Sequence, residues 1–129
     1  MVFDVSAALK NGPILGDGAM GTQIQQARLP AAVCPEEYNV IQGDAIEAIH
    51  RAYVEAGSNI ILTNTFGCSW FKLRRANVDP ARSEEYIAAG CELARRAAAV
   101  DWTGVRLRAQ IARDKLLGLT LELDYLTVG

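Results

Sequence analysis

The chain has 129 residues, a length that fits a single domain; half of the residues are apolar and 22% are charged. This balance excludes a disordered chain, and a net charge of −2 excludes a strong positive field, so we expect neither nucleic acid nor an anionic membrane as a partner. The sequence contains neither an apolar stretch long enough for a membrane span nor a signal-peptide pattern, which predicts a cytoplasmic protein.

The first segment predicts a short strand and a long connection. The apolar run 13–16 ends in the turn-prone pair Asp17-Gly18, which indicates a buried strand followed by a loop. Residues 19–43 form a mixed connection, in which 20–27 are expected to form a helical turn or two.

A clear helix follows. We expect Asp44 to cap it, with Glu47 three residues further on as in a capping box, and Gly57 to end it. His50 lies in this helix, where packing or a place on the surface face explains it better than catalysis. The apolar residues at helical spacing are Ile46, Ile49 and Tyr53.

The next segment repeats this order. Residues 59–65 have a β-branched apolar centre without alternation, which predicts a parallel strand buried on both faces. A short helix is expected at 69–75, and Asp79-Pro80 is expected to open a helix towards Ala99. Its buried stripe is predicted to be Ile87, Cys91, Ala94 and Ala98.

Strands that alternate with helices predict an α/β fold with a parallel sheet, since parallel neighbours need crossover helices. After residue 101 the pattern changes. Residues 105–117 are compatible with a further helix, and 119–125 alternate like a strand with one buried face.

In parallel α/β folds, ligands bind beyond the carboxyl ends of the strands. The first such edge is the glycine-rich segment 16–22. Its backbone N–H groups, that of Gly18 included, can approach a carboxylate, and Asp17 can hold an ammonium group, a combination that suits an amino acid. The alternative is that Asp17-Gly18 only forms a tight turn.

The second edge follows the strand at 59–65. Thr63, Asn64 and Thr65 place polar side chains at the end of an apolar strand, where a ligand could use their hydrogen-bonding capacity. The alternative is that neighbouring loops satisfy these groups.

Three cysteines are present, with a spacing typical of neither a disulfide framework nor a zinc knuckle. Cys68 follows the second edge, but the only histidine, His50, is not near it in sequence, so a core or loop thiol is favoured over a nucleophile.

Several ordered motifs between about residues 10 and 100 resemble the homocysteine S-methyltransferase family, most closely its cobalamin-dependent members. The resemblance implies a (β/α)₈ TIM barrel, of which this chain would form the first three or so units, since a full barrel needs about 250 residues. The motifs are Leu15-Gly16-Asp17-Gly18-Ala19-Met20-Gly21-Thr22, Cys34-Pro35-Glu36, Asn39, Ile49-His50, Tyr53, Ala56-Gly57-Ser58 and Leu62-Thr63-Asn64-Thr65-Phe66-Gly67.

The resemblance also implies a chemistry: zinc held by cysteine thiolates activates the thiol of homocysteine, which accepts a methyl group to give methionine. Carried over, Asp17 would bind the substrate ammonium, Gly18 would offer its N–H group, and Thr63 and Asn64 would help to hold the amino-acid end. The family's Gly-Gly-Cys-Cys motif does not occur here, and none of the three cysteines matches a zinc-ligand position. We therefore expect no catalytic residue to be assignable and the isolated chain to be inactive, with cobalamin and methyltetrahydrofolate, if used, on other domains.

Residues 1–129 are thus interpreted as one partial homocysteine-binding domain, with a tail at 101–129 that the resemblance does not cover. An alternative is a non-catalytic half-barrel that self-associates or pairs with a complementing C-terminal half, because open sheet edges must be covered. A nucleotide-binding module is disfavoured, since neither GxGxxG nor GxxxxGK[ST] is present.

Overall fold

The computed structural model describes residues 5–98 and 106–108 of the chain. In this part the elements follow one another as α1 (Val5–Lys10), α2 (Gly21–Gln26), the 3₁₀ helix η1 (Pro35–Glu37), α3 (Tyr38–Ile41), α4 (Gly43–Glu55), β1 (Ile60–Leu62), α5 (Trp70–Arg75), the 3₁₀ helix η2 (Pro80–Arg82), α6 (Ser83–Ala98) and β2 (Arg106–Arg108). No helix among these is both long and apolar enough to cross a membrane.

The strands run parallel, as the alternation of strands and helices predicted. β1 pairs with β2 so that Ile61 lies opposite Leu107, and a further parallel bridge joins Gly16 to Ile60. The chain before Asp17 is tied to the start of β1, because the Ile60 N–H donates to the Leu15 carbonyl at 3.0 Å. β1 therefore has a parallel neighbour on each side.

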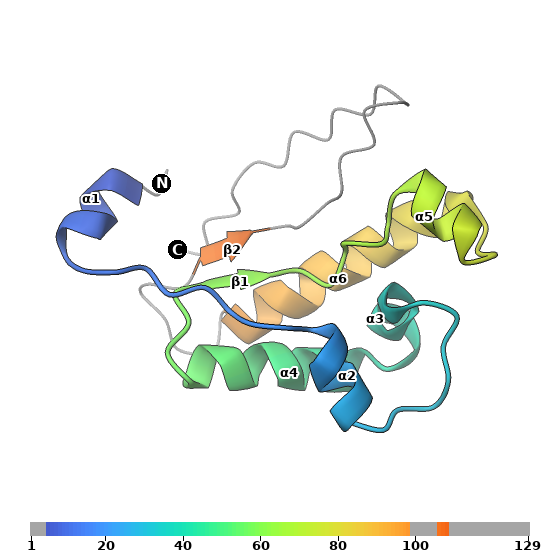
Figure 1. The fold of residues 1–129 in the computed structure, drawn as a ribbon, viewed down its shortest axis with the longest axis horizontal. Coiled ribbons are helices and arrows are strands. Elements are labelled where there is room, and N and C mark those ends of the chain that lie inside the picture. The colour runs from blue at the N-terminus through green and yellow to red at the C-terminus, as the bar shows by residue number, and fades with distance from the viewer. Residues whose placement is uncertain (1–4, 99–105, 109–129) are drawn as a thin grey trace.

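Helices α4 and α6 lie side by side along the strands, while α5 lies beyond the carboxyl end of β1 (Figure 1). Ile61 points towards the helices and is fully buried, whereas Ile60 and Leu62, which alternate with it, are only half-buried. The core beneath the sheet is made of Val54, Ile61, Ala94, Ala97 and Ala98.

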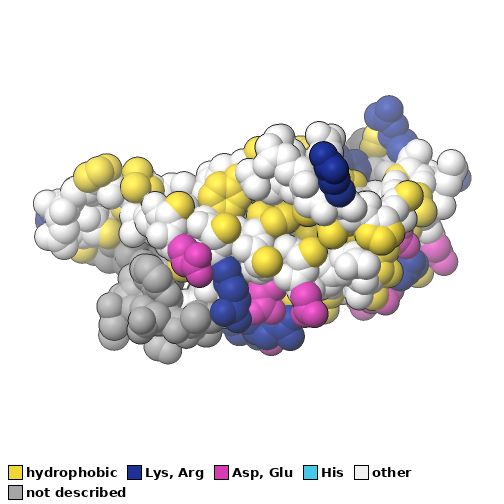
Figure 2. All heavy atoms as spheres, turned by 90° about the horizontal axis from the view of Figure 1, so that it is seen from below, with side chains coloured by type: hydrophobic (Ala, Val, Ile, Leu, Met, Phe, Trp, Pro, Cys, Tyr) yellow, Lys and Arg dark blue, Asp and Glu magenta, His cyan; other side chains and the backbone are white. Residues whose placement is uncertain are grey.

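The face of α4 that is buried repeats every four residues, because positions i and i+4 lie above one another on a helix. Ile46, His50 and Val54 are all buried on it. On the outer side, Glu47 pairs with Arg51 of its own helix and with Arg96 of α6 at 2.8 Å. Figure 2 shows basic and acidic side chains next to one another along one border of this side of the molecule.

Two expectations on the helices are corrected. Asp44 does not cap α4: the chain is already helical in α3, Gln42 occupies the N-cap without a side-chain cap bond, and Asp44 lies inside the first turn. In α6, Ile87 and Cys91 are only half-buried. The buried stripe also includes residues that the sequence did not single out, and consists of Tyr86, Gly90, Leu93, Ala94, Ala97 and Ala98.

The helix starts at Ser69 and Asp79 are confirmed. The Ser69 hydroxyl accepts a hydrogen bond from the Lys72 N–H, and the Asp79 carboxylate accepts one from the Ala81 N–H. Asp79 caps the single turn η2, from which α6 continues at Ser83.

The strands differ from the sequence expectation in extent. The segment 13–16 contributes a single bridge, and β1 covers 60–62 rather than 59–65, because the Thr65 N–H turns back to the Thr63 carbonyl. The helix expected at 105–117 is wrong at Arg106–Arg108, which form a strand because the open edge of β1 offers backbone hydrogen bonds. The rest of that helix and the strand expected at 119–125 lie outside the described residues.

Candidate functional site

Asp17 occupies the carboxyl end of the strand region and is bound to the end of β1. Its N–H donates to the Ile60 carbonyl at 2.9 Å, and its Oδ2 accepts from the Leu62 N–H at 2.9 Å. Its other oxygen, Oδ1, is buried and has no hydrogen-bond partner in the described part of the chain. Burial raises the pKa of this carboxyl, against the lowering effect of the Leu62 N–H. A buried acceptor without a donor is costly and is the feature that a cationic ligand group would satisfy.

Gly18 follows in a loop that packs against the Tyr53 side chain. The Tyr53 hydroxyl donates to the Ala19 carbonyl at 2.7 Å. A Cβ at Gly18 would lie 2.9 Å from that hydroxyl oxygen, so only glycine lets the loop approach the ring this closely. The Gly18 and Ala19 N–H groups make no hydrogen bond to residues that the structure describes.

Thr63 and Asn64 lie directly after β1 and are buried. The Thr63 and Thr65 hydroxyls are hydrogen-bonded to each other at 2.7 Å. The Asn64 carboxamide donates to the Pro35 carbonyl at 2.8 Å and to Oδ1 of Asn39 at 2.9 Å. Both N–H bonds of Asn64 are thus made within the protein, and its role in ligand binding stays a prediction.

Two residues that no sequence argument singled out for the site hold this edge in place. Asn39 is 4% exposed and donates to the backbone carbonyls of Asn64 at 2.8 Å and of Tyr86 at 3.1 Å. Glu36 is buried, and its Oε1 accepts from the Gly67 N–H at 2.7 Å. The signal available in the sequence was the Cys-Pro-Glu segment and Asn39 of the resemblance, but their partners lie 25 to 47 residues away.

The structure therefore brings together the two edges that the sequence singled out. Asp17 is bonded to Leu62, the residue that precedes Thr63, so its carboxylate lies at the same end of the sheet as Thr63 and Asn64. His50, to which the sequence assigned no chemistry, is fully buried, and burial lowers its pKa to about 4.

The cysteines do not provide a metal centre. Burial raises the pKa of all three thiols, that of Cys68 to about 12, which opposes the thiolate form that binds zinc. Cys68 lies in an apolar cluster with Leu73, Val78 and Tyr86. Among the described residues, no three His, Cys, Asp or Glu side chains are arranged to hold a metal ion. The zinc implied by the resemblance does not fit the residues described.

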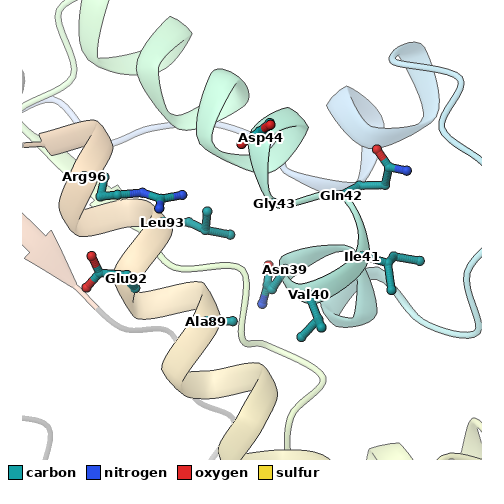
Figure 3. A pocket seen from close by; sticks show the side chains of 10 residues that line it. All are labelled: Asn39, Val40, Ile41, Gln42, Gly43, Asp44, Ala89, Glu92, Leu93 and Arg96. Carbon is teal, nitrogen blue, oxygen red and sulfur yellow. The ribbon is translucent and has the colours of Figure 1, made fainter.

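A groove of about 480 Å³ lies elsewhere, between the α3–α4 junction and α6 (Figure 3). Leu93 and Val40 line it, and Asp44, Glu92 and Arg96 add charge. None of the four predicted site residues borders it. The groove and the candidate amino-acid site are therefore separate features.

The parallel strands with helices packed along them place the chain in the class of α/β proteins, in which ligands generally bind at the carboxyl ends of the strands. The family model of "Homocysteine S-methyltransferase" matches residues 14–113, and the chain belongs to this family.

Two curated relatives carry names that agree with this family. The chain is 38% identical over 101 residues to the methionine synthase of Mycobacterium tuberculosis, a match that covers 74% of this chain and 8% of the relative. It is 43% identical over 72 residues to the methionine synthase of Mycobacterium leprae, which covers 51% of this chain and 6% of the relative. The chain thus spans less than a tenth of the length of these relatives.

Solved structures share the fold. The metallated form of the homocysteine methyltransferase MmuM from Escherichia coli superposes with a TM-score of 0.67 at 23% identity, covering 80% of this chain and 39% of that one. The oxidized form gives a TM-score of 0.61 at 27% identity, covering 72% of this chain and 33% of that one.

Proposed function

We propose that this chain forms the part of a homocysteine S-methyltransferase that binds the amino-acid end of homocysteine. The observation that carries the proposal is Oδ1 of Asp17, a buried carboxylate oxygen without a partner in the described residues, next to the end of β1. A substrate ammonium group would supply the missing donors and the opposite charge.

The neighbouring residues would complete the site. The N–H groups of Gly18 and Ala19 would receive the substrate carboxylate, and Thr63 would contribute from the end of β1. Asn64, whose carboxamide is bonded to Asn39 and to the Pro35 carbonyl, would act chiefly by holding Thr63 in place.

The same proposal takes these residues as the first units of a (β/α)₈ barrel. Support comes from the parallel β1–β2 pair, from the family match and from the half-buried Ile60 and Leu62, which a barrel interior would cover. Zinc and the thiolate chemistry would require ligands other than the residues described, so no methyl-transfer step is assigned to this chain alone. A cytoplasmic location, and cobalamin or methyltetrahydrofolate on other domains, remain predictions.

Binding of L-homocysteine to the full chain tests the proposal by isothermal titration calorimetry under reducing conditions. The variant Asp17→Asn keeps an oxygen that can accept from the Leu62 N–H but removes the charge. We expect it to weaken binding by about 10- to 100-fold, the range for a hydrogen bond to a charged group.

The matched control is Asp44→Asn, which makes the same charge change at an exposed position outside the site. It should bind as the unchanged chain does. Equal affinities for the Asp17 and Asp44 variants, or no binding by a folded chain, would refute the proposal. Turnover of homocysteine to methionine by the pure 129-residue chain would refute the separate expectation that it is inactive alone.

A further inference from the structure

Exposed aromatic side chains and cations are interleaved around α5. Three aromatic residues are 40% to 54% exposed, and each has a cation over its ring. We call these six residues the α5 patch: Lys72 Nζ lies 3.1 Å from the centroid of the Phe66 ring, the Arg74 guanidinium 4.8 Å from Trp70 and the Arg75 guanidinium 5.8 Å from Phe71.

The cations of the patch differ from those of the neighbouring helices. Arg51 of α4 and both Arg95 and Arg96 of α6 form ion pairs with glutamates. Within the described part of the chain, none of the three cations of α5 does so. The segment 66–78 contains no Asp or Glu, in a chain whose net charge is −2. The patch is thus a local excess of positive charge.

The patch is held in a defined position. Ser69 caps α5 through the Lys72 N–H, and Lys72 Nζ also donates to the Phe66 carbonyl at 3.2 Å. The preceding loop is fixed by the bond from the Gly67 N–H to Glu36. A surface that is ordered before binding loses less conformational entropy when a partner docks.

We propose that the α5 patch docks a protein surface rich in carboxylates and apolar side chains. Aromatic residues and arginine are the types enriched at the centres of protein interfaces, and three cations without an ion pair in the described part of the chain favour an acidic complement. Because Phe66 follows Thr65 directly, a partner on the patch would stand beside the candidate amino-acid site.

Other occupants fit less well. Three cations would neutralise few phosphates, which disfavours nucleic acid. The cations lie over the ring faces and α5 has only six residues, which disfavours insertion into a lipid surface.

Fluorescence of the full chain tests the proposal. Trp102→Phe leaves Trp70 as the only tryptophan, and the probe is an acetylated ten-residue peptide of eight glutamates and two leucines. We expect saturable quenching or enhancement that weakens as salt is raised. The triple change Lys72→Gln, Arg74→Gln, Arg75→Gln should weaken binding at least about tenfold, as expected for losing charge pairs at an interface.

The matched control, Lys10→Gln, Arg28→Gln, Arg95→Gln, makes the same charge change elsewhere and should retain the affinity within about twofold. Equal weakening in both triples, or no saturable response, would overturn the proposal. So would tighter binding to vesicles containing phosphatidylserine or to a single-stranded oligonucleotide. Calorimetry with homocysteine is read separately, so that a failure of the patch and a failure of the amino-acid site are distinguishable.

Discussion

Asn39 and Asn64 hold each other by reciprocal hydrogen bonds, in which Asn39 Nδ2 donates to the Asn64 carbonyl at 2.8 Å and Asn64 Nδ2 donates to Asn39 Oδ1 at 2.9 Å. Asn39 lies in α3 and Asn64 just after β1, so the pair joins the end of the strand to the helical layer. Both residues are buried, and removing either one leaves polar groups of the other without a partner.

The effects of substituting Asn39 and Asn64 on the stability of the fold should be strongly coupled. Asn39→Ala and Asn64→Ala should each lower the free energy of unfolding by about 1–3 kcal/mol. The first leaves the Asn64 carbonyl and an Asn64 Nδ2 N–H without Asn39, and the second leaves Asn39 Oδ1 and the Pro35 carbonyl without their Asn64 donor. The double variant should lose clearly less than the sum of the two. Urea unfolding of the four proteins measures this cycle, and strictly additive losses would show that the two side chains do not stabilise the fold jointly.

Any side chain at Gly90 of α6 should destabilise the fold, because the space for a Cβ atom is already occupied. A Cβ there would lie 2.7 Å from Asn39 Nδ2 and 3.0 Å from Cγ2 of Thr65. Gly90→Ala should therefore destabilise the chain by about 1–3 kcal/mol, although alanine normally favours a helix over glycine by about 1 kcal/mol. Gly21→Ala is the control, since no atom lies within 4 Å of its Cβ position. A stabilising effect of Gly90→Ala in thermal unfolding would contradict the packing described.

The buried His50 side chain should make the fold less stable in mild acid. Its side chain is fully buried, neither ring nitrogen has a partner in the described residues, and burial lowers its pKa from 6.5 to about 4. Above pH 6.5 the residue is neutral in both states. As the pH falls from 6.5 to 4, His50 binds a proton in the unfolded chain but stays neutral in the folded chain. The free energy of unfolding should therefore drop by about 3 kcal/mol.

His50→Phe removes this titration without stranding a hydrogen-bond partner. Its free energy of unfolding, measured in urea at intervals between pH 7 and 4.5, should fall less steeply than that of the unchanged chain. Parallel curves for the two proteins would assign the acid sensitivity to other groups.

Homocysteine binding is expected to depend on the ionisation of Asp17. The pKa of this carboxyl is raised by burial, so protonation begins at a higher pH than for an ordinary aspartate, and the neutral acid no longer attracts an ammonium group. Affinity should decline as the pH falls through that raised pKa, and the decline should be absent in Asp17→Asn. Circular dichroism at each pH confirms that the chain is folded where affinity is compared.

The half-buried face of β1 predicts association. Ile60 and Leu62 lie on the side of the strand opposite Ile61, which is the residue that α4 and α6 cover. Apolar side chains that remain partly in water favour a second surface. Sedimentation velocity over a hundredfold range of concentration should show a rising mean mass, and Leu62→Lys should suppress it. A constant monomer mass would contradict this prediction.

The sequence predicted which residues meet at one edge of the sheet better than it predicted the limits of the elements, and ligand binding at that edge stays a prediction. Asp17 and Thr63 were chosen because glycine-rich and polar residues follow apolar runs, and the Asp17–Leu62 bond places both at one edge. The strand expected at 59–65 was too long, because the chain turns at Thr65. The cap expected at Asp44 was wrong, because helix α3 already precedes α4. Both features depend on contacts that local sequence patterns do not contain.

The sequence by itself determined the succession of α4, β1, α5 and α6, the membership of a methyltransferase family and the chemical types at the two edges, since these follow from local periodicity and motif order. Only the tertiary structure decided that Asn39 is hydrogen-bonded to Asn64 and that there is no room for a Cβ atom at Gly90. It also decided that Oδ1 of Asp17 is buried without a partner in the described chain. Such relationships join residues that are distant along the chain, and burial and hydrogen bonding are properties of that three-dimensional packing rather than of neighbouring residues.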